Sequence, residues 1–144
     1  MDTKRIVEEL ILKHNSNNPF IIADNLGITV LYSDMNNTLG FYSKYKRFKF
    51  IHLNQNMPEK LQTFVCGHEL CHAIVHPNKN TPFLRRYILY SVDKLERQAN
   101  TFAVELLLTD KILQEYPNCS LYNIARYVGV PEKLVDLKVL PTES

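Results

Sequence analysis

The sequence is poor in several features that define particular protein classes. It has no tryptophan, only three cysteines and a formal net charge of +2. Cys66, Cys71 and Cys119 include no closely spaced pair such as CxxC, which argues against a disulfide framework and favours a reducing compartment. Because positive and negative charges nearly balance, the composition gives no electrostatic reason to expect nucleic acid as a partner.

Long apolar segments are also missing. No run approaches the roughly 18 apolar residues that a membrane-spanning helix needs. The opening stretch MDTKRIVEELILKH is polar and amphipathic, without the apolar core and small-residue cleavage site of a signal peptide. We therefore expect a cytoplasmic protein with no membrane contact. A length of 144 residues is typical of one domain, so residues 1–144 are assigned to a single domain.

The patterns that are present predict an α+β fold. Short segments rich in β-branched and aromatic residues predict three strands, which together suggest a small antiparallel three-stranded sheet: 28–32, 39–43 and 48–53. Apolar residues three and four positions apart, with capping and stop signals, predict helices in the remainder: 3–14, 19–26, between Pro58 and Pro77, from Ser91 or Asp93 onward, from Thr109 to Pro117, 120–128 and 132–139. The sheet is expected to pack on this helical core.

The strongest chemical signal is the HExxH sequence that runs from His68 to His72. Residues four apart share one face of a helix, about 5–6 Å between Cβ atoms, so two imidazoles at this spacing converge on one Zn²⁺. Both histidines continue the apolar stripe of their helix and should face the core, where a metal supplies the partner they need. Glu69 turns away from the ligand pair and is the candidate general base for a metal-activated water.

Catalytic zinc normally takes three protein ligands, so a third must be found. The all-histidine pattern HExxHxxGxxH fails, because the required glycine and histidine are absent. We expect the third ligand to be Glu96, which lies 24 residues after His72 on the next long helix. Asn100 is four residues further on and is expected to orient a ligand. Two alternatives remain open for Glu96: a solvent-exposed position, or a capping role after Asp93.

Neighbouring residues allow more than one interpretation. His76 is expected to lie beside the site or at the surface, because it is a further turn along the helix. Cys71 is interpreted as a small buried apolar residue, with competition for the metal as the alternative. An extended substrate is expected to add to a sheet edge, and the segment 48–53 is the candidate for that edge.

Two segments, 67–76 and 95–107, together resemble the ImmA/IrrE family of metallopeptidases. The family pattern is HELGHxxxH followed by ExxAN-x-FAxxLL, and the resemblance spans roughly residues 19 to 139. The sequence departs from the pattern at Cys71, where the family usually has glycine.

The resemblance implies a zincin-like core with His68, His72 and Glu96 as zinc ligands and Glu69 as general base. The closest likeness is to ImmA-type anti-repressor proteases of phages and integrative elements. It implies a zinc-dependent endopeptidase whose substrate is a protein partner, a helix-turn-helix repressor.

Two other functions are considered. The first is a non-catalytic regulator with the same fold that binds the repressor without cutting it. The second is a DNA-binding regulator acting through residues 120–139, which resemble a helix-turn-helix in outline. The second helix of that pair, PEKLVDLKVL, has few side chains suited to reading bases. We therefore expect no sequence-specific nucleic acid binding and assign 120–139 to the same domain.

Overall fold

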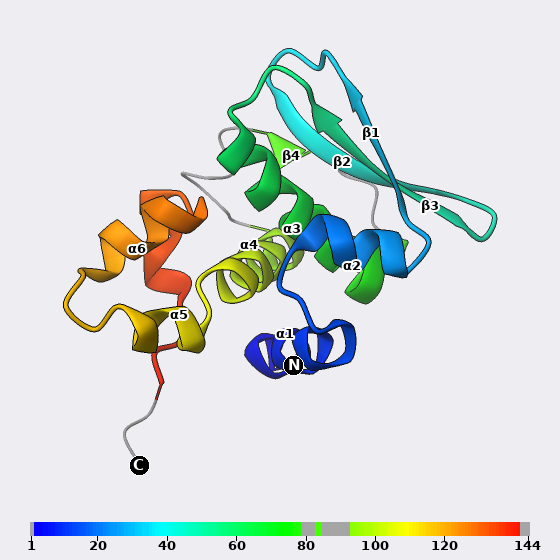
Figure 1. Ribbon diagram of the computed structural model, residues 1–144. Coiled ribbons are helices and arrows are strands. Elements are labelled where there is room, and N and C mark those ends of the chain that lie inside the picture. The colour runs from blue at the N-terminus through cyan, green and yellow to red at the C-terminus, as the bar shows by residue number, and fades with distance from the viewer. Residues whose placement is uncertain (1, 79–82, 85–92, 142–144) are drawn as a thin grey trace.

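The computed structural model describes residues 2–78, 83–84 and 93–141, and in it helices pack against a small sheet (Figure 1). The strands are β1 (Thr29–Ser33), β2 (Thr38–Tyr45), β3 (Phe48–Asn54) and β4 (Phe83–Leu84). The helices are α1 (Thr3–His14), α2 (Pro19–Asn25), α3 (Glu59–Val75), α4 (Lys94–Leu107), α5 (Asp110–Glu115), α6 (Leu121–Val128) and the 3-10 helix η2 (Glu132–Leu137). The predicted α+β class is confirmed. Within these ranges, no helix combines the length and apolar character needed to cross a membrane.

The sheet differs from the prediction in two respects. Its strand order is β1-β3-β2-β4, so β4 adds a fourth strand beside β2. β2 and β3 form an antiparallel hairpin as predicted, but β1 pairs with β3 in parallel. The sheet is therefore mixed and four-stranded, and the expectation of a three-stranded antiparallel sheet is wrong in these details.

The parallel pair arises because β3 lies between β1 and β2, which follow each other closely in the sequence. A connection as short as 34–37 normally joins two strands that pair with each other in a hairpin. The sequence pattern therefore gave no reason to expect another strand between β1 and β2. The Asn54 side chain, at the end of β3, donates to the carbonyl oxygens of Asn36 and Thr38, at 3.0 Å each. The Gln55 N–H donates to the Ser33 carbonyl at 2.9 Å. These bonds hold β3 in the middle of the sheet.

The position of β3 also changes which strand is available at the sheet edge. The candidate substrate edge over 48–53 is wrong, because β3 is paired on both sides. The strand beyond it is β2, whose outer edge pairs with β4 at Thr38↔Leu84 and Gly40↔Phe83. β4 is therefore the outermost described strand on that side of the sheet.

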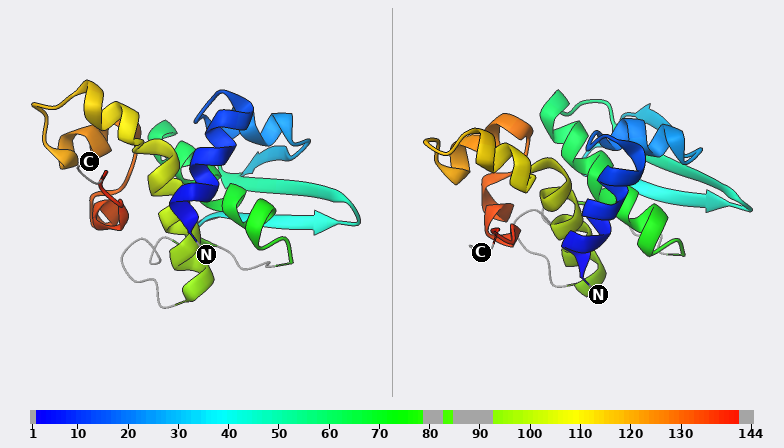
Figure 2. Two further views of the ribbon diagram at one scale, coloured as in Figure 1. Left: turned by 90° about the horizontal axis from the view of Figure 1, so that it is seen from below. Right: turned by 60° about the horizontal axis from the view of Figure 1, so that its bottom comes forward.

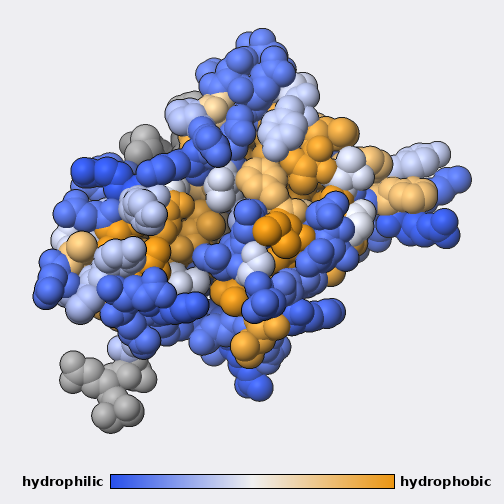
Figure 3. Space-filling model, viewed as in Figure 1, coloured by the Kyte–Doolittle hydropathy of each residue, from blue (hydrophilic) through white to orange (hydrophobic). Residues whose placement is uncertain are grey.

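The β2–β3 hairpin projects from the body of the molecule, and its tip is mainly hydrophilic (Figures 1 and 3). Lys46 adopts a left-handed φ of 55° in the turn. The exposed ring of Tyr45 has the Lys46 ammonium 5.5 Å from its centroid, and the ring of Phe48 has the Arg47 guanidinium at 5.3 Å. The cations thus cover the aromatic faces at the tip.

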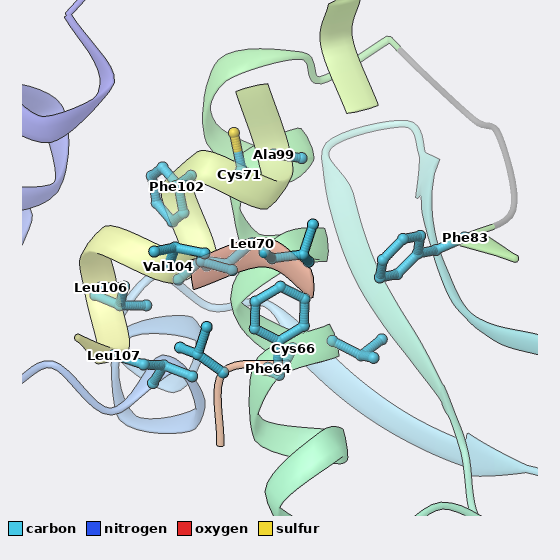
Figure 4. Packing of buried hydrophobic residues seen from close by; sticks show 14 of the residues in the cluster. Phe64, Cys66, Leu70, Cys71, Phe83, Ala99, Phe102, Val104, Leu106 and Leu107 are labelled. Atoms are coloured by element: carbon cyan, nitrogen blue, oxygen red, sulfur yellow. The ribbon is translucent and has the colours of Figure 1, made fainter. Parts of the chain in front are cut away.

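The centre of the fold is α3, which confirms the helix predicted between Pro58 and Pro77. Every residue from Phe64 to Ala73 is buried, so this stretch of helix is enclosed on all sides. The sheet strands β2 and β3 cover part of its surface, and α2 and α4 cover more. Figure 4 shows the apolar side chains of α3 and α4 meeting around Phe64, Leu70 and Phe102.

α3 and α4 approach closely where Gly67 faces Ala103. A Cβ atom placed on Gly67 would lie only 3.3 Å from the Cβ of Ala103. Two small residues at a helix crossing allow the backbones to come near each other. α1 then packs across α4 (Figure 2).

The pair of short helices predicted over 120–139 is present as α6 and a 3-10 helix, and the second of them ends at Leu137 rather than at Val139. Ser120 caps α6 at its start, and Gly129 ends it with a φ of 99°. The next helix, η2, spans only Glu132–Leu137 and begins directly after Pro131, and segments this short commonly adopt 3-10 geometry. A six-residue 3-10 helix packed against α4 is poorly suited to enter a DNA groove.

A buried charge network fixes the chain after η2. The Lys138 ammonium donates to Glu105 at 2.7 Å and to Asp110 at 2.8 Å, and the Lys138 and Glu105 side chains are each only 1% exposed. The second Glu105 oxygen accepts from the Val139 N–H at 2.8 Å, and Lys4 also pairs with Asp110. Burial alone would raise the pKa of Asp110, but its hydrogen bonds to Lys138 and Lys4 hold the pKa below its usual value.

Replacing Lys138 with methionine should destabilise the fold by about 3–5 kcal/mol, because Glu105 would keep a buried charge without its cation. The double variant Lys138→Met, Glu105→Leu should recover at least half of that loss. Urea unfolding of the three proteins measures both values. A double variant as unstable as Lys138→Met alone would show that packing, not charge pairing, dominates here.

Candidate active site

Three side chains named from the sequence come together in the core. His68, His72 and Glu96 each offer one ligand atom, and these atoms lie within 4.8 Å of one another. One oxygen of Glu96 is 2.7 Å from Nε2 of His68, and the other is 3.0 Å from Nε2 of His72. All three residues are buried, with at most 2% of each exposed. The site is thus an enclosed cluster of two imidazoles around one carboxylate.

Two helices supply these groups. α3 presents both histidines on one face, one turn apart, and α4 presents Glu96 from its first turn. The Asp93 side chain caps α4 by accepting from the N–H groups of Leu95 and Glu96, at 2.8 and 3.3 Å. The solvent-exposed alternative for Glu96 does not hold, because its carboxylate lies between the two imidazoles.

The hydrogen bond from His68 to Asn100 shows what this cluster needs. Nδ1 of His68 lies 2.8 Å from Oδ1 of Asn100, an acceptor, so Nδ1 carries the hydrogen. In a neutral imidazole, Nε2 is then the lone-pair nitrogen, and it faces a Glu96 oxygen at 2.7 Å. Two acceptors at this distance require a proton or a cation between them. A divalent metal ion would satisfy both imidazoles and the carboxylate together, so the residues fit a metal.

The pKa shifts of His68 and Glu96 agree with a site that binds a cation. Burial lowers the pKa of His68, which favours the neutral, metal-binding form. Burial by itself would raise the pKa of Glu96, but donors and positive charge at His68 and His72 outweigh it and lower that pKa to about 2, and a metal cation held between these groups would act in the same direction. Glu96 therefore stays ionised, as a ligand must.

Glu69 lies in the same enclosure and is fully buried. Its Oε2 is 3.9 Å from Nε2 of His68, and neither carboxylate oxygen makes a hydrogen bond to any described residue. Burial raises the pKa of Glu69, and the negative charge of Glu96 raises it further. A buried carboxylate in this state is costly for folding, which is typical of a functional position rather than a structural one.

Cys71 is fully buried in the core, beside Ala99 of α4 (Figure 4). Burial raises the pKa of the thiol, and the charges of Glu69 and Glu96 raise it further, so the reactive thiolate is disfavoured. Cys71 is also not among the ligand atoms that converge with His68. Both observations favour the interpretation of Cys71 as a small apolar residue.

Phe83 contacts His68, His76 contacts His72, and Gln98 contacts His76 in turn; of these, only His76 was expected beside the site from the sequence, with the surface as its alternative. The ring of Phe83, from β4, stacks on His68 with centroids 3.7 Å apart and planes 1° from parallel. Nδ1 of His76 lies 3.0 Å from Nδ1 of His72, and Nε2 of His76 lies 2.7 Å from Oε1 of Gln98. The four-residue spacing from His72 to His76 was the available signal for His76. No pattern pointed to Phe83 or Gln98.

Comparison with known proteins agrees with this geometry. The IrrE N-terminal-like domain family matches residues 23–140. "Uncharacterized immunity region protein 2" of Bacillus phage phi105 is 45% identical over 140 residues, which cover 95% of this chain and 89% of that protein. "Metallopeptidase ImmA" of Bacillus subtilis (strain 168) is 36% identical over 142 residues, covering 94% and 83%. The chain therefore belongs to the IrrE N-terminal-like family of peptidases, as the ImmA/IrrE resemblance of its sequence implies.

Proposed function

We propose that the chain is a zinc-dependent endopeptidase, with zinc held by His68, His72 and Glu96 and with Glu69 as the general base. The observation that carries the proposal is the buried convergence of three ligand atoms next to a carboxylate that has no hydrogen-bond partner among the described residues. Two imidazoles and one carboxylate are a donor set typical of catalytic zinc, which leaves a further position for water or substrate.

The residues divide the chemistry between them. Bound zinc would supply Lewis acidity, which polarises a peptide carbonyl and makes water more acidic. The Glu69 carboxylate takes the proton of the attacking water and passes it to the leaving amine. Burial, and next the charge of Glu96, raise the pKa of Glu69 above that of an ordinary carboxylate, which makes it a stronger base for the proton of the attacking water. Asn100 holds the His68 ring in the orientation that directs Nε2 at Glu96.

For the substrate we propose a helix-turn-helix repressor, cut at one or a few bonds. The similarity to a protein named metallopeptidase ImmA supports the peptidase activity. The name of the phage relative, an immunity region protein, supports a role in controlling the state of a phage or a related element. Relief of repression by cleavage is the anti-repressor activity that the ImmA-type resemblance implies.

Glu69→Gln tests the general base separately from the metal ligands. It keeps the side-chain volume and removes the basic carboxylate, so cleavage should fall by roughly 10²–10⁴ while zinc content stays near one per chain. Glu59→Gln, an exposed change on the same helix, is the matched control and should keep full activity. Cleavage assays and metal analysis of purified proteins measure both. Unchanged cleavage by Glu69→Gln would remove Glu69 from the mechanism.

Glu96→Ala tests the third ligand. It should lower zinc occupancy and abolish the rise in thermal stability that zinc gives to the wild type, because metal binding to the folded state is linked to folding. Glu115→Ala, an exposed change on α5, serves as control. Metal analysis and thermal unfolding with and without a chelator give the result. If Glu96→Ala retained its full zinc content, Glu96 would not be a metal ligand.

The substrate proposal is tested by co-expressing the chain with the helix-turn-helix repressor of its own genetic element. Mass spectrometry should find discrete repressor fragments with the wild type and an intact repressor with Glu69→Gln. An intact repressor with a zinc-loaded wild type, under conditions that induce the element, would instead favour a regulator that binds without cutting.

A further inference from the structure

A chain of hydrogen bonds leads away from His72 on the side opposite to Glu96. Nδ1 of His72 lies 3.0 Å from Nδ1 of His76, and Nε2 of His76 lies 2.7 Å from Oε1 of Gln98. The Gln98 amide nitrogen then donates to Oγ1 of Thr3 at 3.4 Å. The chain thus links the end of α3 to α4 and to the first residue of α1.

The direction of these bonds follows from the acceptor at Gln98. Oε1 of Gln98 has no hydrogen, so Nε2 of His76 donates to it. In a neutral His76 ring, Nδ1 is then an acceptor, and Nδ1 of His72 must donate to it. Nε2 of His72 is left as the lone-pair nitrogen, and it is the atom 3.0 Å from Glu96. The bonds therefore select the tautomer of His72 that binds a metal through Nε2.

His68 is held in the same way by a shorter route, since its Nδ1 meets the Asn100 oxygen directly. Both imidazoles are consequently oriented by amide side chains of α4, the helix that also carries Glu96. His72 instead contacts His76, which in turn contacts Gln98. The His72–His76 contact is partly buried, with ring centroids 5.2 Å apart.

We propose that His76 and Gln98 are positioning residues of the metal site, which fix the tautomer and ring orientation of His72 without touching metal or substrate. This inference rests on the proposed function, because it presupposes a metal bound by His72. Partners of this kind typically contribute 10–100-fold to metal affinity. His76→Leu should therefore weaken zinc binding by about that factor. His76→Asn, whose amide oxygen takes the place of Nδ1 as acceptor, should stay much closer to the wild type.

The experiment measures zinc affinity by chelator competition, the visible spectrum of the cobalt-substituted proteins, and thermal unfolding of the metal-free forms. Positioning predicts a weaker affinity and an altered cobalt spectrum for His76→Leu, with little change in the unfolding temperature of the metal-free protein. If His76 had only a structural role, His76→Leu would lower the unfolding temperature of the metal-free protein and leave zinc affinity and the cobalt spectrum nearly unchanged. That result would overturn the proposal. Equal losses for His76→Leu and His76→Asn would also overturn it, because the acceptor would then be irrelevant.

Gln98→Met tests whether the two residues act in series. Alone it should weaken zinc binding, but in a His76→Leu background it should add little, because the link to His72 is already broken. Gln62→Met is the matched control: Gln62 lies on α3 and donates to the backbone carbonyls of Gln55 and Met57, away from the cluster, so zinc affinity should not change. Additive losses of zinc affinity from Gln98→Met and His76→Leu would show that the two residues do not act in series.

The wild type separates this inference from the proposed function. A wild type that binds no zinc would contradict the proposed function itself. A wild type that binds zinc tightly, with variants that bind it equally well, would contradict only this inference.

Discussion

The close contact between α3 and α4 at Gly67 and Ala103 is the constraint on which the site depends. α3 is enclosed by the sheet and by α2, so it cannot move away from α4 to admit a larger residue. With only 3.3 Å between a Cβ on Gly67 and the Ala103 Cβ, the two backbones are held near their closest approach. That approach lets the Glu96 carboxylate contact both histidines of the neighbouring helix. The position of Glu96 between the two histidines of α3 therefore depends on the small residues at this crossing.

The same crossing places polar groups where an apolar core would be more stable. Glu69, Glu96 and two imidazoles are enclosed among Leu and Phe side chains, and two carboxylates in one enclosure repel each other. Without a cation, folding has to overcome both the loss of hydration and this repulsion. A bound metal ion offsets both. Metal binding and stable packing of α3 on α4 are thus expected to be parts of one coupled equilibrium.

Local patterns were sufficient for most helices and for the three residues that converge in the core, His68, His72 and Glu96. HExxH places two histidines on one helix face by periodicity alone, and the next amphipathic helix contains Glu96 at a suitable distance along the chain. The parallel β1–β3 pair was not predictable, because it depends on bonds from Asn54 and Gln55 to residues before β2. Phe83 was missed for the same reason: its stacking on His68 depends on the pairing of β4 with β2. Features that require long-range contacts leave little trace in periodicity or capping signals.

The start of α1 connects the two ends of α4. Thr3 accepts a hydrogen bond from Gln98, near the cluster of His68, His72 and Glu96. Lys4 pairs with Asp110 and donates to the Val139 carbonyl at the other end. Glu105, in the last turn of α4, is meanwhile held by Lys138 and the Val139 N–H. α4 is thus fixed at one end by the cluster and at the other by the buried charge network. Because Glu96, Gln98 and Asn100 all orient groups on α3, immobilising α4 from both ends is what keeps the two histidines directed at one point.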